Sequence, residues 1–358
     1  TVKRFEEQAV AYLQCDAAIG VASGSDALLL SLMALGIGGG DAVLVPTFTF
    51  FSTVSSITRL GATPIFVDID PESCLLDVKK VEALLAEHCR PHPDGQGLME
   101  SKTQRRIKAI LPVHLFGQSC SMAPLVAIAR RYHLRIVEDV AQAFGARALL
   151  SPGVAKPAGT IGDLGCFSFF PTKTLGGIGD GGLVVSDQKD LADRVRMLRV
   201  HGANSKYHHQ AVGLNSRLDA IQAAVLMVKL RHVDEWCEER IERARRYQKL
   251  FSETGLVGEQ IIGLPPSSSG KGHVFNYYVI RVEQRDDLWR YLGKRGIQTE
   301  VYYPLPLHLQ PCFAHLGYRR GDFPNAELAA SQVLALPMYP ELTPEQQEVV
   351  VREMRNFY

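Results

Sequence analysis

Short apolar runs alternate with helical patterns over the first two-thirds of the chain, and this alternation constrains the fold most strongly. The apolar runs predict strands at Ala42–Val45, Ile65–Asp68, Ile107–Val113, Arg135–Glu138, Cys166–Phe170 and Gly182–Ser186. Apolar residues at three- and four-residue spacing predict intervening helices at Asp26–Leu35, Asp77–Glu87, Met122–Tyr132 and Asp190–Leu198. Such connections favour an α/β fold with a mainly parallel sheet flanked by helices, whose ligand site lies beyond the carboxyl ends of the strands.

The pattern changes after about residue 230, which predicts a large α/β domain over residues 1–230 and a smaller α+β domain over residues 231–358. Arg231–Phe251 is a highly charged helical segment that we interpret as a solvated connector. The small domain is then expected to contain a strand (Asn276–Val282), a helix (Asp286–Arg295), a Pro-rich loop (Tyr302–Pro311) and a final helix that opens on a capping box at Thr343. Two loops are interpreted as surface excursions: His88–Arg106, which is polar without clear periodicity, and Leu149–Thr160, which is rich in Pro and Gly.

Composition excludes several classes of protein. The formal net charge of the 358 residues is +1, which argues against a broad basic surface for nucleic acid. No apolar run approaches the roughly 20 residues of a membrane span. The 7 cysteines form no C-x-x-C pair, so we expect neither a zinc site nor a disulfide framework, and the cytoplasm is the default compartment. Because the chain begins with Thr1 rather than Met, we expect that residues precede it.

The first candidate for chemistry is Lys173, which follows the aromatic strand ending at Pro171 and precedes a run of glycines. A lysine amine forms a Schiff base with a carbonyl once burial lowers its pKa, and glycines let the backbone approach a bulky ligand. The alternative is an exposed lysine after a Pro turn. Taken alone the segment is more typical of that alternative, which is weakened by the position of Lys173 at the carboxyl end of a strand, beside Ser168.

The second candidate is Asp139, which the apolar strand Arg135–Glu138 delivers to its own carboxyl end. A buried carboxylate needs a cation, and the protonated pyridine nitrogen of pyridoxal phosphate (PLP) is one. Gln142, three residues on, is placed to meet the phenolic oxygen of that ring. A helix cap or a surface acid is the alternative for Asp139.

Two further segments fit a phosphorylated aromatic ligand. Small residues at Ser23–Asp26 begin an apolar helix, and the free N–H groups of a helix start bind phosphate, although an ordinary helix cap has the same pattern. Phe50 lies just past a predicted strand and can stack on a flat ring or pack in the core.

These residues together resemble those of fold-type I PLP enzymes, and several sequence motifs are similar to those of the DegT/DnrJ/EryC1/StrS family of sugar aminotransferases. The matching phrases run nearly from end to end of the chain and include SGSDALLLSLMALGIGGGD, VPTFTFFST, VEDVAQAFGA, GDLGCFSFFPTKTLGGIGDGG, GLNSRLDAIQAAVL and YYPLPLHLQPCF. One departure is Thr174, where asparagine is common in the family.

The resemblance implies a role for each matched residue. Lys173 would form the Schiff base, Asp139 would pair with the pyridine nitrogen, and Gln142 would meet O3′ of the ring. Phe50 would take the stacking position. Four residues would surround the phosphate, namely Gly24, Ser25, Asp26 and Ser168. Asn215 and Arg217 would reach the phosphate region of the neighbouring subunit, which implies a homodimer with shared active sites; a turn residue is the alternative for Asn215.

The resemblance also implies amino transfer from L-glutamate to a keto-sugar nucleotide. Retention of Lys173 favours transamination over the sugar dehydratases of the family, which have histidine there. Tyr303 and His308, in the Pro-rich loop, are candidates for substrate contacts, with a packed turn as the alternative. The loop favours a 3-keto sugar, although Tyr302 stands where many such enzymes have histidine. Amination of a 4-keto-6-deoxy sugar nucleotide and a PLP-binding regulator without turnover are the other hypotheses.

Overall fold

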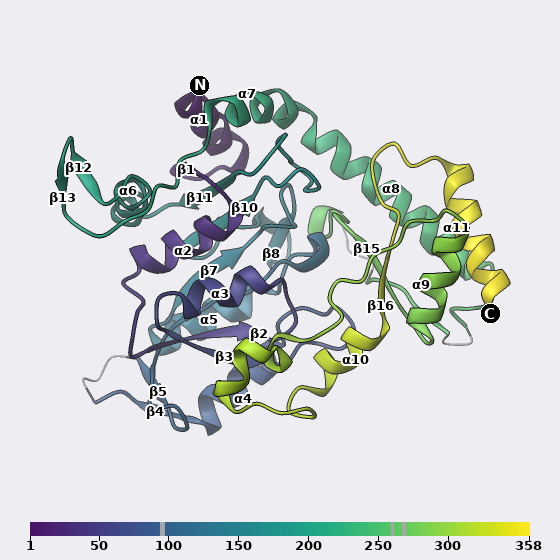
Figure 1. The fold of residues 1–358 in the computed structure, drawn as a ribbon, viewed down its shortest axis with the longest axis horizontal. Helices are drawn as coiled ribbons and strands as arrows, with labels where there is room; N and C mark the ends of the chain where they lie inside the picture. The colour runs from purple at the N-terminus through teal and green to yellow at the C-terminus, as the bar shows by residue number, and fades with distance from the viewer. Residues whose placement is uncertain (94–96, 259–260, 267–269) are drawn as a thin grey trace.

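The computed structural model describes residues 1–93, 97–258, 261–266 and 270–358. Within these residues the centre of the fold is a nine-stranded sheet whose main path runs β1-β11-β10-β7-β6-β2-β3 (Figure 1). Neighbouring strands from β10 to β3 are parallel, and β11 runs antiparallel to both of its neighbours. The α/β class and the mainly parallel sheet are therefore confirmed.

The strands of this sheet are β1 (Ala17–Val21), β2 (Asp41–Pro46), β3 (Thr63–Val67), β4 (Cys89–Pro91), β5 (Leu98–Glu100), β6 (Arg106–Ile110), β7 (Arg135–Asp139), β10 (Leu164–Ser168) and β11 (Gly182–Ser186). The helices that surround it are α1 (Val2–Leu13), α2 (Gly24–Ala34), α3 (Phe51–Thr58), α4 (Val78–Glu87), α5 (Met122–Tyr132), α6 (Lys189–Leu198) and α7 (Ala220–Lys229). Most predicted elements agree with these bounds to within about two residues, whereas β6 and β10 end two or three residues earlier than expected.

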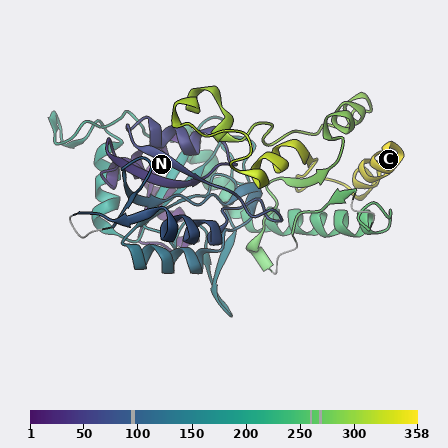
Figure 2. The same cartoon turned by 90° about the horizontal axis from the view of Figure 1, so that it is seen from below.

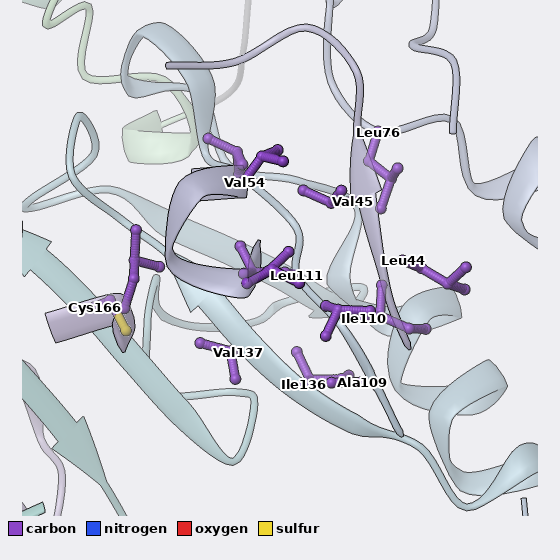
Figure 3. Close-up of a cluster of buried hydrophobic side chains, with 14 of the residues drawn as sticks. Leu44, Val45, Val54, Leu76, Ala109, Ile110, Leu111, Ile136, Val137 and Cys166 are labelled. Atoms are coloured by element: carbon purple, nitrogen blue, oxygen red, sulfur yellow. The ribbon is translucent and has the colours of Figure 1, made fainter. Parts of the chain in front are cut away.

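Both faces of the sheet are buried, as a mainly parallel sheet requires. On β11, Val184 belongs to one core cluster, which α2 and α6 also line, while Leu183 and Val185 belong to a second cluster lined by α1 and α7. Figure 3 shows part of the first cluster, where side chains of β2, β6 and β7 meet Val54 of α3. This packing fixes the strand ends that carry the site.

The two loops interpreted as surface excursions contain hairpins. In the first, β4 pairs with β5, and β5 adds to the start of β6, while residues 94–96 lie outside the described part. In the second, β8 (Arg147–Ser151) pairs with β9 (Val154–Pro157). These strands have only three to five residues each, too few to show a clear alternation of apolar and polar residues, which explains why the sequence did not indicate them.

The C-terminal part has a second sheet, in the order β14-β15-β16, and its own core cluster. Its elements are α8 (Val233–Ser252), β14 (Ile262–Gly263), β15 (Tyr278–Val282), α9 (Arg285–Lys294), α10 (Pro324–Gln332), β16 (Val333–Leu336) and α11 (Pro344–Phe357), and Figure 2 shows most of them to the right of the large sheet. The capping box at Thr343 is confirmed. The division near residue 230 stays a prediction; there the turn Leu230–His232 joins α7 to α8.

The interpretation of Arg231–Phe251 as a solvated connector is wrong. One face of α8 is buried: Val233 belongs to the second core cluster of the large sheet, whereas Ile241, Tyr247 and Phe251 belong to the core cluster of the C-terminal part. Its charged residues occupy the opposite face and hid the apolar stripe in the sequence. No helix in the described part of the chain has the length and apolar character needed to cross a membrane.

Candidate active site

The predicted site residues follow strands that end at one edge of the large sheet. Because β1, β2, β7 and β10 point the same way, the segments after them meet at their carboxyl ends. The segment after β1 leads into α2 at Gly24, and the segment after β2 leads into α3 at Phe51. Asp139 and Ser168 are the last residues of β7 and β10. The structure therefore brings the predicted site residues to the sheet edge where a ligand site is expected in a parallel sheet.

The start of α2 lies directly against the end of β10. A Cβ atom added to Gly24 would stand 2.7 Å from Cβ of Ser168, so only glycine allows this approach. Ser23 caps the helix by accepting a hydrogen bond from the Asp26 N–H at 3.1 Å, and the Ser52 hydroxyl contacts the Ser25 hydroxyl at 2.6 Å. Free N–H groups, the positive end of the helix and several hydroxyls together suit a phosphate.

Asp139 is held in a dry environment by two donors. The Thr53 hydroxyl donates to Oδ2 at 2.8 Å and the Ala141 N–H donates to Oδ1 at 3.1 Å, while the residue is only 4% exposed. Burial raises the pKa of the Asp139 carboxyl, and the hydrogen bond from Thr53 and the charge of Lys173 oppose that rise. Among the described residues no salt bridge to Asp139 is present, so the carboxylate still lacks a close cation.

Lys173 lies in the loop that leaves β10. Its backbone N–H donates to the carbonyl of Phe170 at 2.9 Å, which closes a turn after the strand. Its Nζ lies 5.7 Å from the centre of the Tyr277 ring, and its charge affects the pKa of Asp139 across the site. The structure therefore brings Lys173 and Asp139, 34 residues apart in the sequence, into one site.

Gln142 joins three segments through its amide. Its Oε1 accepts the N–H of Phe116 at 2.7 Å, and its Nε2 donates to the Tyr303 hydroxyl at 3.0 Å. The Tyr303 ring centre lies 6.0 Å from that of Phe50, which is 56% exposed. Tyr303 and Phe50 thus form an aromatic wall beside Gln142, and an exposed Phe50 ring suits stacking on a ligand.

His308 lies where it has no ring nitrogen left for a sugar. Its Nδ1 is 2.8 Å from Oγ1 of Thr47, its Nε2 is 3.1 Å from Oε1 of Glu327, and the residue is 1% exposed. This geometry does not fit the predicted substrate contact and agrees with the alternative of a packed turn. His308 instead anchors the Pro-rich loop to the end of β2.

Asn215 and Arg217 lie on the exposed segment before α7. That exposure is compatible with a role toward another subunit, which stays a prediction. The segment His208–His209 forms β13, which pairs with β12 (Ala203–Ser205) in an exposed hairpin beside α6 (Figure 1).

Two residues near the centre of the site, Thr53 and Tyr277, were missed in the sequence. Thr53 lies in the first turn of α3, three residues after Phe50, and this nearness in the sequence to a predicted site residue could have indicated it. Tyr277 belongs to the segment before β15, and its contact with Lys173 depends on how the C-terminal part packs on the large sheet.

PLP fits these residues. Its pyridinium would supply the cation that the buried Asp139 lacks, and its phosphate matches the donors at the start of α2. Fold and site together define a PLP-dependent enzyme. The model of the DegT/DnrJ/EryC1/StrS aminotransferase family matches residues 1–355, and the chain belongs to this family. It is an aminotransferase of fold-type I, and PLP is its cofactor.

Several known proteins are similar over nearly the whole chain. A "pleiotropic regulatory protein" of Geobacillus stearothermophilus is 45% identical over 100% of this chain and 89% of its own length. UDP-N-acetyl-3-dehydro-alpha-D-glucosamine 3-aminotransferase of Acidithiobacillus ferrooxidans is 40% identical over 92% and 80%, respectively. The crystal structure of S. venezuelae DesV in complex with a ketimine intermediate superposes with a TM-score of 0.88 at 40% identity, covering 99% of this chain and 88% of DesV.

Proposed function

We propose that this enzyme transfers an amino group from L-glutamate to the ketone of a sugar nucleotide, with a 3-keto sugar as the favoured acceptor. The observation that carries the proposal is the pair of Lys173 and Asp139 at one sheet edge, with Asp139 buried and without a salt-bridge partner among the described residues. An amine for carbonyl chemistry and an anion for a pyridinium are the two groups that PLP-dependent amino transfer requires.

Each residue then has a distinct task. PLP, when bound, acts as the electron sink and carries the amino group. The amine of Lys173 would hold the cofactor through its carbonyl carbon and, when free, would move the proton at the donor carbon as base and then acid. Asp139 would keep the pyridine nitrogen protonated, Gln142 would face the phenolic oxygen, and Phe50 would stack on the ring.

The same proposal assigns the phosphate to the segment around Gly24, Ser25, Asp26 and Ser168. The contact of Gly24 with Ser168 supports this assignment, because it joins the helix start and the strand end into one surface. Tyr303 is the substrate-facing candidate of the Pro-rich loop, since its hydroxyl already meets Gln142.

Relatives support the 3-keto preference through their names. Two of them, 40% and 36% identical, are dTDP-3-amino-3,4,6-trideoxy-alpha-D-glucose transaminase of Streptomyces venezuelae and dTDP-3-amino-3,6-dideoxy-alpha-D-galactopyranose transaminase of Aneurinibacillus thermoaerophilus. The alternative, a 4-keto-6-deoxy acceptor, is kept because GDP-perosamine synthase of Caulobacter vibrioides is 34% identical over 96% of the chain. A panel of 3-keto and 4-keto sugar nucleotides, assayed with L-glutamate, distinguishes the two.

A homodimer with shared active sites is part of the proposal. Exposed apolar side chains support it: Phe170 and Ile178 are 48% and 65% exposed near Lys173, and Ile221 on α7 is 69% exposed. The Ile178 N–H donates to Gln222 of α7 at 2.9 Å, so the loop and the helix form one surface.

Mixing two inactive variants tests whether sites are shared. In a shared site, Lys173 comes from one subunit and Arg217 from the other. A mixed dimer of Lys173→Ala with Arg217→Ala therefore has one site with both substitutions and one site with neither. Random exchange should therefore restore about a quarter of wild-type activity, because half of the dimers are mixed and each has one intact site. Recovery of no activity would contradict a shared site.

Lys173→Ala tests the anchor itself. The variant should lose both the Schiff-base absorbance and the cofactor adduct that borohydride fixes. Lys229 of α7, whose amine donates to the carbonyl of Gly176 in the same loop at 2.8 Å, should be replaceable by Met without either loss. Retention of both signals in Lys173→Ala would place the Schiff base elsewhere.

A regulator without turnover is the second candidate, and the names of two relatives favour it, the Geobacillus protein and the erythromycin biosynthesis sensory transduction protein EryC1, 42% identical over 98% of this chain. A regulator would bind PLP and yet fail to aminate any sugar ketone with glutamate. The presence of Lys173, Asp139 and Gln142 in one site supports turnover instead. The cytoplasm remains the predicted compartment.

A further inference from the structure

One segment of the C-terminal part, Gly272–Tyr277, contacts two parts of the site, the turn at Phe116 and Gly117 and the loop that carries Lys173. Its Val274 N–H donates to the carbonyl of Gly117 at 2.9 Å, and its Tyr277 N–H donates to the carbonyl of Phe116 at 3.2 Å. Phe116 in turn donates its N–H to Gln142. The segment is therefore joined to the residue expected at the phenolic oxygen of the cofactor.

On its other side, the same segment holds the residue after Lys173. Oδ1 of Asn276 accepts two hydrogen bonds from Thr174, one from the backbone N–H at 3.0 Å and one from the hydroxyl at 3.1 Å. Asn276 is 2% exposed and Thr174 is 4% exposed, so water cannot replace these bonds. The backbone that carries Lys173 is thus fixed by a side chain from the C-terminal part.

The fit of the segment against the large sheet leaves little freedom. A Cβ atom added to Gly117 would stand 2.8 Å from the backbone nitrogen of Asn276, and Gly117 has a φ of +99°. Asn276 therefore rests directly on the turn that follows β6. The backbone on either side of Asn276 is fixed relative to Gln142, because Val274 and Tyr277 donate to the carbonyls of Gly117 and Phe116, and the N–H of Phe116 donates to Gln142.

We infer that Asn276 is a positioning residue that sets Lys173 relative to Gln142, and so places the amine at the correct distance from the phenolic side of the cofactor. The inference rests on the proposed role of Lys173. Lys173 comes from the end of β10 and Gln142 from the end of β7, and strand pairing alone does not fix how the loops beyond them face each other. The Thr174–Asn276 contact supplies that constraint.

A double-mutant cycle on the dissociation constant of PLP tests the inference without measuring turnover. Asn276→Ala removes the acceptor of two buried hydrogen bonds, and we expect the dissociation constant to rise about tenfold or more. If Asn276 acts through Lys173, the same substitution should change the constant less than about threefold in the Lys173→Ala background. Equal effects in the two backgrounds, or no effect in either, would overturn the inference.

Three companion variants make the cycle specific. Thr174→Ser keeps both donors and should bind PLP as the wild type does, whereas Thr174→Val loses the hydroxyl and should bind it several-fold more weakly. Gln347→Ala removes another buried amide, which donates to the Arg243 carbonyl at 2.8 Å in the C-terminal core, and should leave PLP binding unchanged. If Asn276→Ala does not fold, Thr174→Val takes its place in the cycle with the same criterion.

The same data separate this inference from the proposed function. Wild-type protein that forms no Schiff-base absorbance with PLP, or Lys173→Ala protein that still forms it, would refute the assigned role of Lys173 and the inference with it. Normal behaviour of those two proteins, together with equal effects of Asn276→Ala in both backgrounds, would refute the inference alone.

Discussion

Replacing Asp139 by asparagine removes a negative charge while nearly preserving shape, and this change tests the electrostatic account of the site most directly. The carboxylate is 4% exposed and has Thr53 and Ala141 as donors. Removing one partner of a buried ion pair costs about 3–5 kcal/mol. Since 1.36 kcal/mol corresponds to a tenfold change in rate, the half-reaction with L-glutamate should slow roughly 10²- to 10⁴-fold.

The stability of the protein without cofactor should change in the opposite sense. Burial raises the pKa of Asp139, so the ionised carboxylate opposes folding, and stability falls as pH rises from the unfolded value of about 3.9 through the higher folded value. Asparagine has no such cost. The apoprotein of the variant should therefore melt no lower than wild type near pH 7, whereas added PLP should raise the melting temperature of wild type by more than that of the variant.

Asp68 offers a matched control, because it is also a buried aspartate just beyond a strand end of the same sheet. It is 3% exposed, but Nζ of Lys80 lies 2.6 Å from its Oδ2, so it already has its cation. Asp68→Asn should lower the melting temperature and leave the absorbance changes of the half-reaction close to wild type. Turnover of Asp139→Asn within tenfold of wild type would refute the pairing of Asp139 with the pyridine nitrogen.

Three further predictions concern other parts of the site. Gly24→Ala places a methyl group 2.7 Å from Cβ of Ser168 and should weaken PLP binding at least about tenfold in equilibrium dialysis, whereas Gly39→Ala, with no atom within 4 Å of the added carbon, should not. Glu138→Gln should lower the free energy of unfolding by about 3 kcal/mol near pH 7, because hydrogen bonds from His114 and from backbone N–H groups stabilise the buried carboxylate. These contacts lower the pKa of Glu138, so its contribution is present above the unfolded value of about 4.3 and is lost as pH falls through the folded value; the two unfolding curves should converge in acid. His308→Leu should lower the melting temperature, since Thr47 and Glu327 lose their partner, with little change in KM for the sugar; a large rise in KM at an unchanged melting temperature would restore its role as a substrate contact.

The sequence was informative where one strand or helix determines the outcome. Gly182–Ser186 and Met122–Tyr132 have the predicted bounds, because continuous apolar runs and three- to four-residue spacing reflect burial along a single element. β1 was missed because its residues, Ala17–Val21, include alanine and glycine, which favour strands weakly. The grouping of Lys173 with Asp139 followed from the rule that parallel strands end at one edge.

Contacts between distant segments were beyond the reach of the sequence. Thr53 meets Asp139 across 86 positions and Thr174 meets Asn276 across 102, and no local pattern states which polar side chains face each other after packing. His308 is the converse case, a predicted ligand contact that the folded chain uses for packing. A polar residue in a Pro-rich loop near a site suggests a ligand contact, but its direction is set by Thr47 and Glu327, which belong to other segments. The sequence therefore indicates which residue types lie at the strand ends, and these determine the chemistry of the site. The orientation of those side chains depends on hydrogen-bond partners from distant segments, which only the folded chain brings together.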